Sequence, residues 1–429
     1  MRIRVEGRRP ISGVYRPSGN ANAAQALLAA ALLTDAPVTL RSVPNTSSTR
    51  AMIDTARRLG ATIEATPDAP SDTLGGETVN IRSAQLTRRV LTQADTDIST
   101  GAILFVPPLL IRRQHVRLEL DFPLNRIRTH LEALRDLGVD VMTSSGAVEF
   151  KAGTWDKAQV ILTQASVTAT AMVMMLAARL GRETLIYNAA CEPHVQALAR
   201  ALDQMGAHID GIGSNRLCVY GAPELKGADI TIAPDHIEAA SIAAIGAICG
   251  GRVQIEGVAQ DDLGIIDKIY ERMGIEMDFD GATWFIAKQD VLYLSNREED
   301  VDSSIETAPW PGFPSDLVAV ATVVATQTRG TSLIHEKLFN NRLLFVDKLK
   351  AMGAQIVLCD PHRAIVVGQT PLHGIYVDSP DVRAGLGLLA AALTAEGQSV
   401  IDNAQVIENS FAHVFAKLRA MNAVIEEEG

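Results

Sequence analysis

The chain has 429 residues, of which 47% are hydrophobic and only 4% aromatic, so it predicts two or three domains whose cores rest on aliphatic side chains. Its formal net charge of −11 excludes a general nucleic-acid-binding surface but is compatible with a local site for a small anion. The four cysteines form no C-x-x-C pair and have no zinc-site spacing, which suits a reduced cytoplasm. We expect neither a metal nor a cofactor.

The first residues, 1–7, are typical of a polar strand and not of a signal peptide. No apolar run approaches the roughly 18 residues of a membrane span. We therefore expect a cytoplasmic protein with no membrane and no nucleic-acid partner, and the sequence leaves the oligomeric state open.

Buried helices rich in Ala and Gly are expected at near-regular intervals along the chain, each followed by a short β-rich stretch such as 38–40 or 184–186. These helices are apolar nearly all round, which is typical of helices inside a domain. The alternation of helix and strand favours an α/β fold over a helical bundle. The predicted inner helices cover 23–33, 99–110, 168–180, 238–249, 315–326 and 382–393.

A phrase of the type Leu-x-x-Leu/Met-Gly-Ala-x-Ile follows each inner helix. It predicts an amphipathic helix that ends at a residue with positive φ and then continues into a strand. The copies fall into two sets of three, which indicates six copies of one supersecondary unit in two halves. The central residues of the phrase are Gly60, Gly138, Gly206, Gly274, Gly353 and Asn422.

Two segments carry residue types suited to chemistry. Residues 18–24 open the first inner helix with Gly, Asn and small residues, and such a helix start either binds an anion through free N–H groups or is an ordinary cap. Residues 306–317 contain three prolines, which predict a stiff loop with Ser315 and Asp316 capping the fifth inner helix. Asp316 is either a first-turn acid that complements the helix dipole or a carboxylate delivered into a cleft.

At these residues the chain resembles the UDP-N-acetylglucosamine enolpyruvyl transferase (1-carboxyvinyltransferase) family over essentially its whole length. The resemblance implies a two-domain inside-out α/β barrel, with six βαβαββ-type repeats, three per domain. It implies a first domain at 21–233, a second at 1–20 plus 234–429, and an active site in the cleft between them. The matching motifs are Ser18-Gly19…Asn22-Ala23-Ala24, Ser166-Val167, Asn188-Ala189-Ala190-x-Glu192-Pro193, Pro234-Asp235-x-Ile237-Glu238, Thr307-Ala308-Pro309…Phe313-Pro314-Ser315-Asp316, Asn341-Arg342 and Asp381-x-Arg383-Ala384.

The family reaction adds a sugar hydroxyl to phosphoenolpyruvate and releases phosphate, so the implied partners are small anions: a nucleotide sugar and phosphoenolpyruvate or an analogue. Such chemistry needs a base near the hydroxyl, an acid for C3 and cations around the anions. The resemblance assigns catalytic roles to Asp316 and Asn22, and a possible lid-acid role to Asp121. It assigns substrate binding to Ser166, Val167, Arg126, Arg342, Asp381 and Arg383.

The sequence departs from the family pattern where the family carries cations or a lid cysteine. The lid segment, 117–123, contains neither Cys nor Gly, so Asp121 is either the lid acid or a strand-end acid. Losing several charge-assisted hydrogen bonds, at roughly 1.5–3 kcal/mol each, would weaken anion binding unless other cations replace them. The four departing positions are Ala21, Thr100, Gln164 and Asn409. The possible replacements, or alternatively a solvated basic face, are Arg112, Arg113, His115, Arg117, Arg126 and Arg128.

Three hypotheses follow. The first is an enolpyruvyl transferase acting on UDP-N-acetylglucosamine or another nucleotide hydroxyl. The second is a divergent paralogue with altered chemistry on a related anion. The third is a non-catalytic protein that binds a nucleotide sugar. Phosphate release from phosphoenolpyruvate separates the first from the other two.

Overall fold

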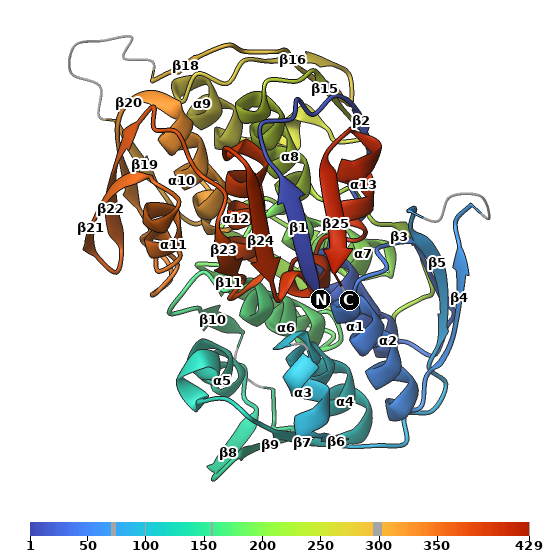
Figure 1. Ribbon diagram of the computed structural model, residues 1–429. Coiled ribbons are helices and arrows are strands. Elements are labelled where there is room, and N and C mark those ends of the chain that lie inside the picture. The colour runs from blue at the N-terminus through green and yellow to red at the C-terminus, as the bar shows by residue number, and fades with distance from the viewer. Residues whose placement is uncertain (70–73, 99, 156–157, 295–302, 429) are drawn as a thin grey trace. The chain divides into compact units, whose positions relative to one another are not determined.

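The structure, a computed structural model, describes residues 1–69, 74–98, 100–155, 158–294 and 303–428. The side chains of residues 97, 98 and 100 lie outside this description. The chain divides into two compact units (Figure 1): unit 1 consists of Met1–Ser18 and Pro234–Gly429, and unit 2 of Gly19–Ala233.

Each described four-stranded path has the same strand directions: one edge strand runs parallel to its neighbour, and the next two pairings are antiparallel. Three such sheets lie in unit 2. They are β14 (Asp229–Thr231), β3 (Val38–Val43), β5 (Glu77–Arg82), β4 (Thr62–Pro67); β6 (Val90–Leu91), β7 (His115–Glu119), β9 (Ala147–Lys151), β8 (Asp140–Ser144); and β10 (Gln159–Ile161), β11 (Glu183–Tyr187), β13 (Arg216–Tyr220), β12 (His208–Asp210).

Unit 1 contains three further sheets with these directions, one of which gains a fifth strand, β19 (Ser304–Glu306), beside β20. The strand orders are β2 (Gly13–Tyr15), β15 (Val253–Glu256), β17 (Thr283–Ile286), β16 (Met277–Asp280); β18 (Leu292–Tyr293), β20 (Thr328–His335), β22 (Arg363–Gly368), β21 (Gln355–Asp360); and β23 (Tyr376–Asp378), β24 (Gln398–Asp402), β1 (Arg2–Glu6), β25 (Val424–Glu428).

The inner helices form near the predicted ranges and are buried almost all round, since they consist largely of Ala, Val, Leu and Ile. Two predicted ranges need correction, since 315–326 begins with the 3₁₀ turn η5 (Ser315–Leu317) ahead of the helix over 318–327, and 99–110 differs in the same way. In place of a single helix over 99–110, the 3₁₀ turn η2 (Thr100–Phe105) precedes α4, because Pro107 and Pro108 lack the N–H groups that would continue a helix and fit its first turn. The inner helices are α1 (Ala21–Ala30), α4 (Val106–Arg113), α6 (Val167–Ala177), α8 (His236–Cys249), α10 (Val318–Gln327) and α12 (Val382–Thr394).

The outer helices end as the recurring phrase predicts. Its six central residues all have positive φ, from 71° at Asn422 to 115° at Gly60, which confirms the left-handed helix endings. Unit 2 also contains α3 (Gln93–Ile98). The outer helices are α2 (Ser47–Leu59), α5 (Arg128–Asp136), α7 (Pro193–Gln204), α9 (Ile265–Arg272), α11 (Val346–Ala351) and α13 (Val414–Ala420). The remaining 3₁₀ turns are η1 (Ala31–Leu33), η3 (Leu124–Ile127), η4 (Gln260–Asp262), η5 (Ser315–Leu317) and η6 (Ala404–Asn409).

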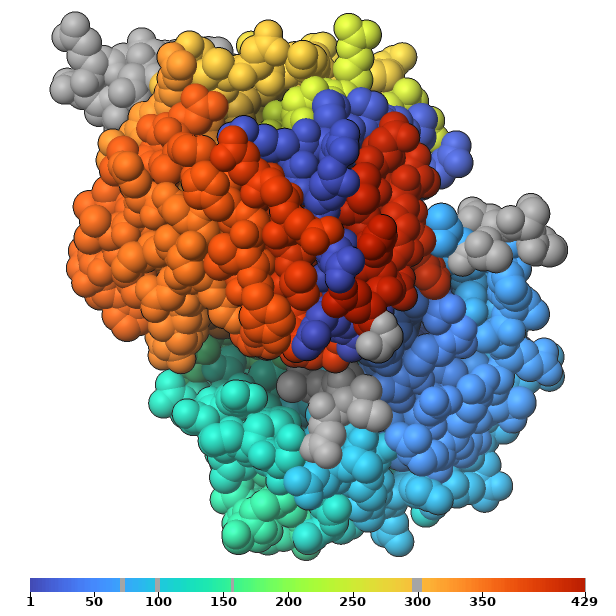
Figure 2. Space-filling view, viewed as in Figure 1, coloured from blue at the N-terminus to red at the C-terminus, as the bar shows by residue number. Residues whose placement is uncertain are grey.

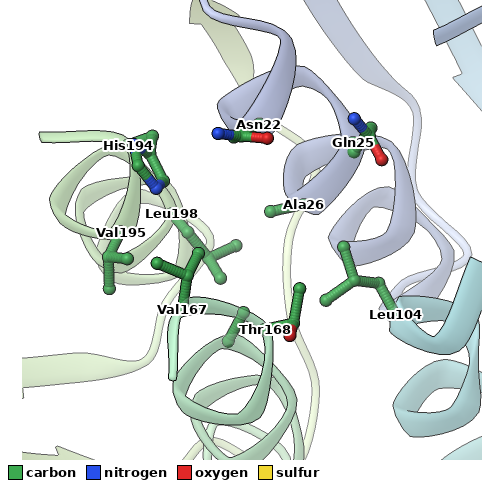
Figure 3. Close-up of a pocket in the computed structure, with 10 residues that line it drawn as sticks. Asn22, Gln25, Ala26, Leu104, Val167, Thr168, His194, Val195 and Leu198 are labelled. Carbon is green, nitrogen blue, oxygen red and sulfur yellow. The ribbon is translucent and has the colours of Figure 1, made fainter. Parts of the chain in front are cut away.

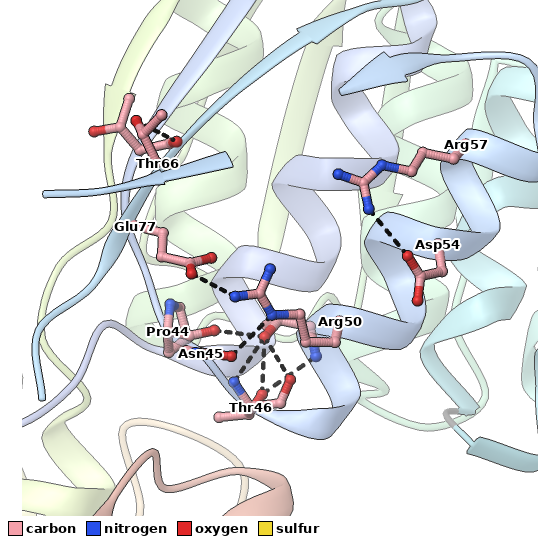
Figure 4. A network of polar contacts seen from close by, with 10 residues as sticks. Pro44, Asn45, Thr46, Arg50, Asp54, Arg57, Thr66 and Glu77 are labelled. Carbon is pink, nitrogen blue, oxygen red and sulfur yellow. Dashed lines mark hydrogen bonds and ion pairs between the residues drawn. The ribbon is translucent and has the colours of Figure 1, made fainter. Parts of the chain in front are cut away.

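The start of α2 is fixed by side chains (Figure 4). Thr46 accepts a hydrogen bond from the Thr49 N–H at 3.2 Å, and its own N–H donates to the Thr49 hydroxyl at 3.1 Å, which is a capping box. Arg50 then binds Asn45 at 2.9 Å and Glu77, tying the helix to β5.

Strand β1 lies between two strands from the other end of unit 1 (Figure 1). It pairs antiparallel with β24 through Ile3 and Ile401, and with β25 through Val5 and Ile425. The same juxtaposition is visible at the surface, where the blue N-terminal segment adjoins red C-terminal atoms (Figure 2). Ile3 and Val5 are fully buried in the core of unit 1.

Among the residues that the structure describes, no helix combines the length and the apolar character that crossing a bilayer requires.

Candidate functional site

The strongest concentration of paired charge near a predicted site residue surrounds Asp316 in unit 1. Arg383 donates its Nε–H to Asp316 Oδ1 at 2.8 Å, and Arg342 Nη2 lies 3.7 Å from the same oxygen. The three side chains are only 22–27% exposed, so solvent screens these interactions less than on an open surface. Unit 1 thus brings together three of the predicted site residues.

Asp381 positions Arg383. It is the N-cap of α12, where its carboxylate accepts hydrogen bonds from the N–H groups of Arg383 at 2.8 Å and of Ala384 at 3.0 Å. Arg383 therefore projects from the first turn of a fixed helix. The negative charge of Asp316 raises the pKa of Arg383, which keeps this guanidinium cationic. Arg342 is held differently, with its guanidinium 4.9 Å from the centre of the Phe339 ring.

The loop that carries Asp316 is organised by a buried acid that the sequence analysis did not single out. Glu336 is fully buried and accepts hydrogen bonds from the Ser315 hydroxyl at 2.5 Å and the Thr307 hydroxyl at 3.0 Å. It also accepts from the N–H groups of Leu338 and Phe339. The prediction that Ser315 and Asp316 cap the fifth inner helix is wrong. The Ser315 hydroxyl donates to Glu336 and not to the helix, and α10 begins without a side-chain cap.

A second buried network lies at the start of α8. Glu238 is 1% exposed and accepts from the Tyr15 hydroxyl at 2.6 Å, the Ser18 N–H at 3.1 Å and Lys417 Nζ at 3.1 Å. Asp235 caps the helix by accepting from the Ile237 N–H at 2.8 Å. Burial, Glu238 and Asp316 raise the pKa of Asp235 to about 7. This part of unit 1 therefore holds a titratable acid within electrostatic reach of Asp316.

Unit 2 presents a small pocket at the N-terminal ends of three helices (Figure 3). Asn22 comes from the first turn of α1, Val167 and Thr168 from the first turn of α6, and His194 from the first turn of α7. Asn22 on α1 and His194 on α7 lie opposite each other in this view. The cavity volume is about 40 Å³, which suits a small substituent and not a whole nucleotide.

Two of the three helix ends around this pocket, those of α1 and α6, have side-chain caps, whereas α7 begins without one. Asn20 accepts from the Ala23 N–H at 2.9 Å, and Ser166 accepts from the Ala169 N–H at 3.3 Å. Ser166 is thus a cap, while its neighbour Val167 lines the pocket. Helix N-termini favour negative charge, so the first turns of these helices are suited to an anionic ligand.

His130 contacts a residue of the same pocket without lining the pocket itself. Its Nε2 lies 2.6 Å from the hydroxyl of Thr168, which lines the cavity. Burial lowers the pKa of His130 to about 4, so it is neutral at physiological pH and adds no cation to the pocket.

The predicted lid residues are not part of this pocket. Asp121 is exposed and lies two residues beyond the end of β7, and Arg126 is exposed in η3. Neither lines the pocket with Asn22 and Val167. Residues 117–119 of the predicted lid segment are strand residues paired with β9.

Most of the predicted basic cluster is occupied within unit 2. Arg112 donates to the carbonyl oxygens of Leu32 and Ala84 and to the Ser83 hydroxyl, and it pairs with Asp35. Arg117 pairs with Glu149 at 3.0 Å, His115 with Glu149 at 3.5 Å, and Arg128 with Glu132 at 3.6 Å. In this structure these four side chains therefore have partners within unit 2, and a role for the cluster in place of the departed cations stays a prediction.

The departing positions contribute no charge where they lie. Ala21 is buried at the start of α1, Gln164 is exposed just before the Ser166 cap, and Asn409 ends η6. Thr100 begins η2, but its side chain lies outside the described residues. Every described residue that lines the Asn22 pocket is uncharged or a histidine.

Known proteins of one enzyme family are similar to this chain over nearly its whole length. Residues 5–418 match the family model described as EPSP synthase (3-phosphoshikimate 1-carboxyvinyltransferase). The chain is 39% identical over 426 residues to a UDP-N-acetylglucosamine 1-carboxyvinyltransferase of Bradyrhizobium diazoefficiens, covering 98% of this chain and 97% of that one. It is 36% identical over 427 residues to a protein of the same name from Borrelia garinii subsp. bavariensis, covering 99% and 98%.

Two solved structures share the fold. The enolpyruvyl transferase NikO from Streptomyces tendae superposes with a TM-score of 0.87 at 21% identity, covering 99% of this chain and 98% of that one. An EPSP synthase from Acinetobacter baumannii superposes with a TM-score of 0.74 at 18% identity, covering 99% of each chain. At these identities the likeness establishes the two-domain α/β fold.

Proposed function

We propose that this chain, which belongs to the enolpyruvyl (1-carboxyvinyl) transferase family and is an enzyme of the alkyl-transferring class, moves the enolpyruvyl group of phosphoenolpyruvate to a hydroxyl of UDP-N-acetylglucosamine or a related nucleotide. With UDP-N-acetylglucosamine as acceptor, the reaction belongs to peptidoglycan synthesis. The observation that carries the proposal is the Asp316–Arg383–Arg342 cluster at positions that resemble the family's cleft residues.

The cluster fits an addition–elimination reaction. The acceptor O–H gives its proton to a base, its oxygen bonds to C2 of the enolpyruvyl group, and C3 gains a proton. The resulting ketal then loses the C3 proton and the C2–O bond to phosphate, which leaves the enolpyruvyl ether and inorganic phosphate. Asp316 is the proposed base, while Arg342 and Arg383 stabilise the anionic reactant.

The proposed roles in unit 2 concern the acceptor. Asn22 binds the sugar, and Ser166 and Val167 bind the diphosphate through backbone groups at the start of α6. Helix N-termini supply N–H donors and positive dipole ends, which supports this role in a pocket whose described lining has no Lys or Arg. Asp381 is proposed as a positioning residue. Asp121 and Arg126 remain candidates for the lid acid and its cation.

We also propose the finer architecture. The three sheets of each unit, with their shared strand directions and paired inner and outer helices, are interpreted as three βαβαββ repeats with the helices inside. Units 2 and 1 then correspond to domains 21–233 and 1–20 plus 234–429.

One observation favours a second candidate function. Because Ala21 is buried and the described lining of the Asn22 pocket has no Lys or Arg, this lining supplies no such cation to hold phosphoenolpyruvate. A paralogue with altered chemistry, or a non-catalytic nucleotide-sugar-binding protein, would account for this arrangement.

One assay separates these functions. The protein is incubated with phosphoenolpyruvate and UDP-N-acetylglucosamine, and phosphate release and the enolpyruvyl product are measured. We expect release in the wild type, a loss in Asp316→Ala, and no loss in Asp347→Ala, an exposed acid of the same unit. Nucleotide-sugar binding by calorimetry without release would favour the binding protein. Binding of neither ligand would favour changed chemistry.

A further inference from the structure

A second hollow in unit 2 lies apart from the Asn22 pocket and shares no lining residue with it. Its cavity volume is about 520 Å³, within the roughly 300–1,000 Å³ range of small-molecule sites. It lies where the C-terminal ends of α4 and α6 meet the loop after β9. The lining residues are Ile111, Gln114, Thr154, Trp155, Arg179, Leu180 and Arg182.

The charge of this hollow is opposite to that of the chain. Among the described residues two arginines line it and no Asp or Glu does, whereas the whole chain carries −11. Arg179 donates to the Pro223 carbonyl, and its buried Nε has no hydrogen-bond acceptor in the described part of the chain. No ion pair joins Arg179 to a described carboxylate. Burial, the largest influence, lowers the pKa of Arg179 together with the charge of Arg112, while the negative charges of Glu224 and Asp35 act in the opposite direction. A partly exposed guanidinium whose printed acceptor is a neutral carbonyl is suited to an added anion.

The planar wall of the hollow is Trp155. This side chain is half-buried and packs against the core of unit 2, so its ring is anchored. Its φ is 54°, an uncommon value for a bulky residue, and Gln114 opposite has a φ of 62°. An anchored indole beside guanidinium groups offers a stacking surface for a planar ring.

The loop that brings Trp155 to this position depends on a close backbone approach. A Cβ at Gly153 would lie 1.8 Å from the Gly138 carbonyl oxygen, so only glycine fits there. The Ala152 N–H donates to the Gln114 carbonyl at 2.9 Å, which fastens the loop to the end of α4. The loop that carries Trp155 is therefore fixed to the end of α4 by a backbone contact.

We propose that this hollow binds a small phosphate-bearing molecule with a planar ring, of the nucleoside monophosphate type. Arg179 and Arg182 hold the phosphate, Trp155 stacks on the ring, and Gln114 and Thr154 bind its polar edge. Such a site lies outside the transfer chemistry and does not depend on the proposed function. The alternative role of Arg179 is to balance the carbonyl end of α6 without any ligand.

The test uses the fluorescence of Trp155, the only one of the three tryptophans whose sequence position falls in unit 2. Uridine 5′-monophosphate is titrated into the full-length protein, with uridine and inorganic phosphate as separate arms. We expect saturable quenching by the monophosphate, weaker binding of the other two, and no quenching in Trp155→Phe. If inorganic phosphate binds with the same affinity as the monophosphate, the proposed stacking of a planar ring on Trp155 is wrong. If uridine 5′-monophosphate causes no quenching at about 10 mM, a concentration beyond the range of weak ligands, the proposed site is wrong.

Substitutions locate the binding. Arg179→Gln is expected to raise Kd about tenfold or more, the equivalent of one charge-assisted hydrogen bond, while Arg200→Gln on α7 leaves it unchanged. Because Arg179→Gln could disturb folding, the exposed Gln114 gives an independent pair: Gln114→Glu should raise Kd and Gln114→Lys should lower it. An Asn22→Asp variant should quench as the wild type does. If Gln114→Glu and Gln114→Lys bind alike, the site is overturned even if the protein binds uridine nucleotides elsewhere.

Discussion

Arg383 reaches Asp316 across 67 residues of sequence and binds its Oδ1 through Nε at 2.8 Å. The contact joins the first turn of α12 to the turn before α10, so the base and the cation proposed for the reaction are fixed by two inner helices of one unit. A planar guanidinium bound through Nε constrains the rotamer of the carboxylate, which a flexible ammonium would not do.

We therefore expect Arg383→Lys to lower kcat for phosphate release by about 10- to 100-fold although the charge is kept. The control is Arg363→Lys, an exposed arginine of unit 1 that pairs with Asp360. An unchanged kcat in Arg383→Lys would show that charge alone matters at this position.

Asp235 should make unit 1 less stable as the pH rises. Its folded pKa of about 7 exceeds the ordinary value of 3.8, so the folded form binds the proton more tightly than the unfolded form. The contribution of Asp235 to the free energy of unfolding is then fully present below about pH 4. It is lost as the pH rises toward 7, by on the order of a few kcal/mol. Asp235→Asn keeps an N-cap residue and removes this titration.

We expect the difference in melting temperature between Asp235→Asn and the wild type to grow in favour of the variant from pH 5 to pH 8. Asp261→Asn, an exposed acid of the same unit, serves as the control. A difference independent of pH would contradict the raised pKa.

Glu238 and Lys417 form a buried ion pair, and breaking it from one side should be costly. Glu238→Gln leaves the ammonium of Lys417, which is 8% exposed, without its carboxylate, for a loss of about 3–5 kcal/mol in unfolding free energy. Replacing both, as Glu238→Gln with Lys417→Met, should restore part of this loss. A double-mutant cycle by denaturant unfolding measures the coupling, and additive losses would contradict the pairing.

Asn22 should control ligand binding to unit 2 through charge. Asn22→Asp places a carboxylate at helix ends that favour anionic ligands, so Kd for UDP-N-acetylglucosamine should rise about tenfold or more. Calorimetry checks this, with Asn125→Asp, an exposed site in η3, as the control. If both variants bind as the wild type does, the nucleotide sugar binds elsewhere.

The fold could be predicted largely because its signals are local. A helix that ends at Gly60 or Gly353 needs only a few neighbouring residues to specify its left-handed ending, and the apolar stretch from Val167 needs only its own composition to specify burial. The prediction over 99–110 differed in detail because Pro107 and Pro108 set the start of α4.

The polar networks could not be predicted in this way because their partners are distant in sequence. Lys417 lies on an outer helix, and only its meeting with Glu238, 179 residues away, explains its burial. Glu336 likewise gains its role from Thr307 and Ser315. The charge of Arg112 makes it a candidate anion ligand, whereas in the structure its guanidinium donates hydrogen bonds to the Ser83 hydroxyl and the Ala84 carbonyl. Charge alone does not tell a ligand from a structural cation.

The position of β1 between β24 and β25 has a consequence for biosynthesis. Strand β1 leaves the ribosome some 400 residues before β25, and neither of its sheet neighbours exists until translation is nearly complete. Unit 2 is continuous in sequence and can fold while the rest of the chain is still being made. Unit 1 cannot complete its fold until its last strand, β25, has been synthesised. A nascent chain stalled before residue 398 would therefore carry a completed unit 2 and an unpaired, aggregation-prone β1.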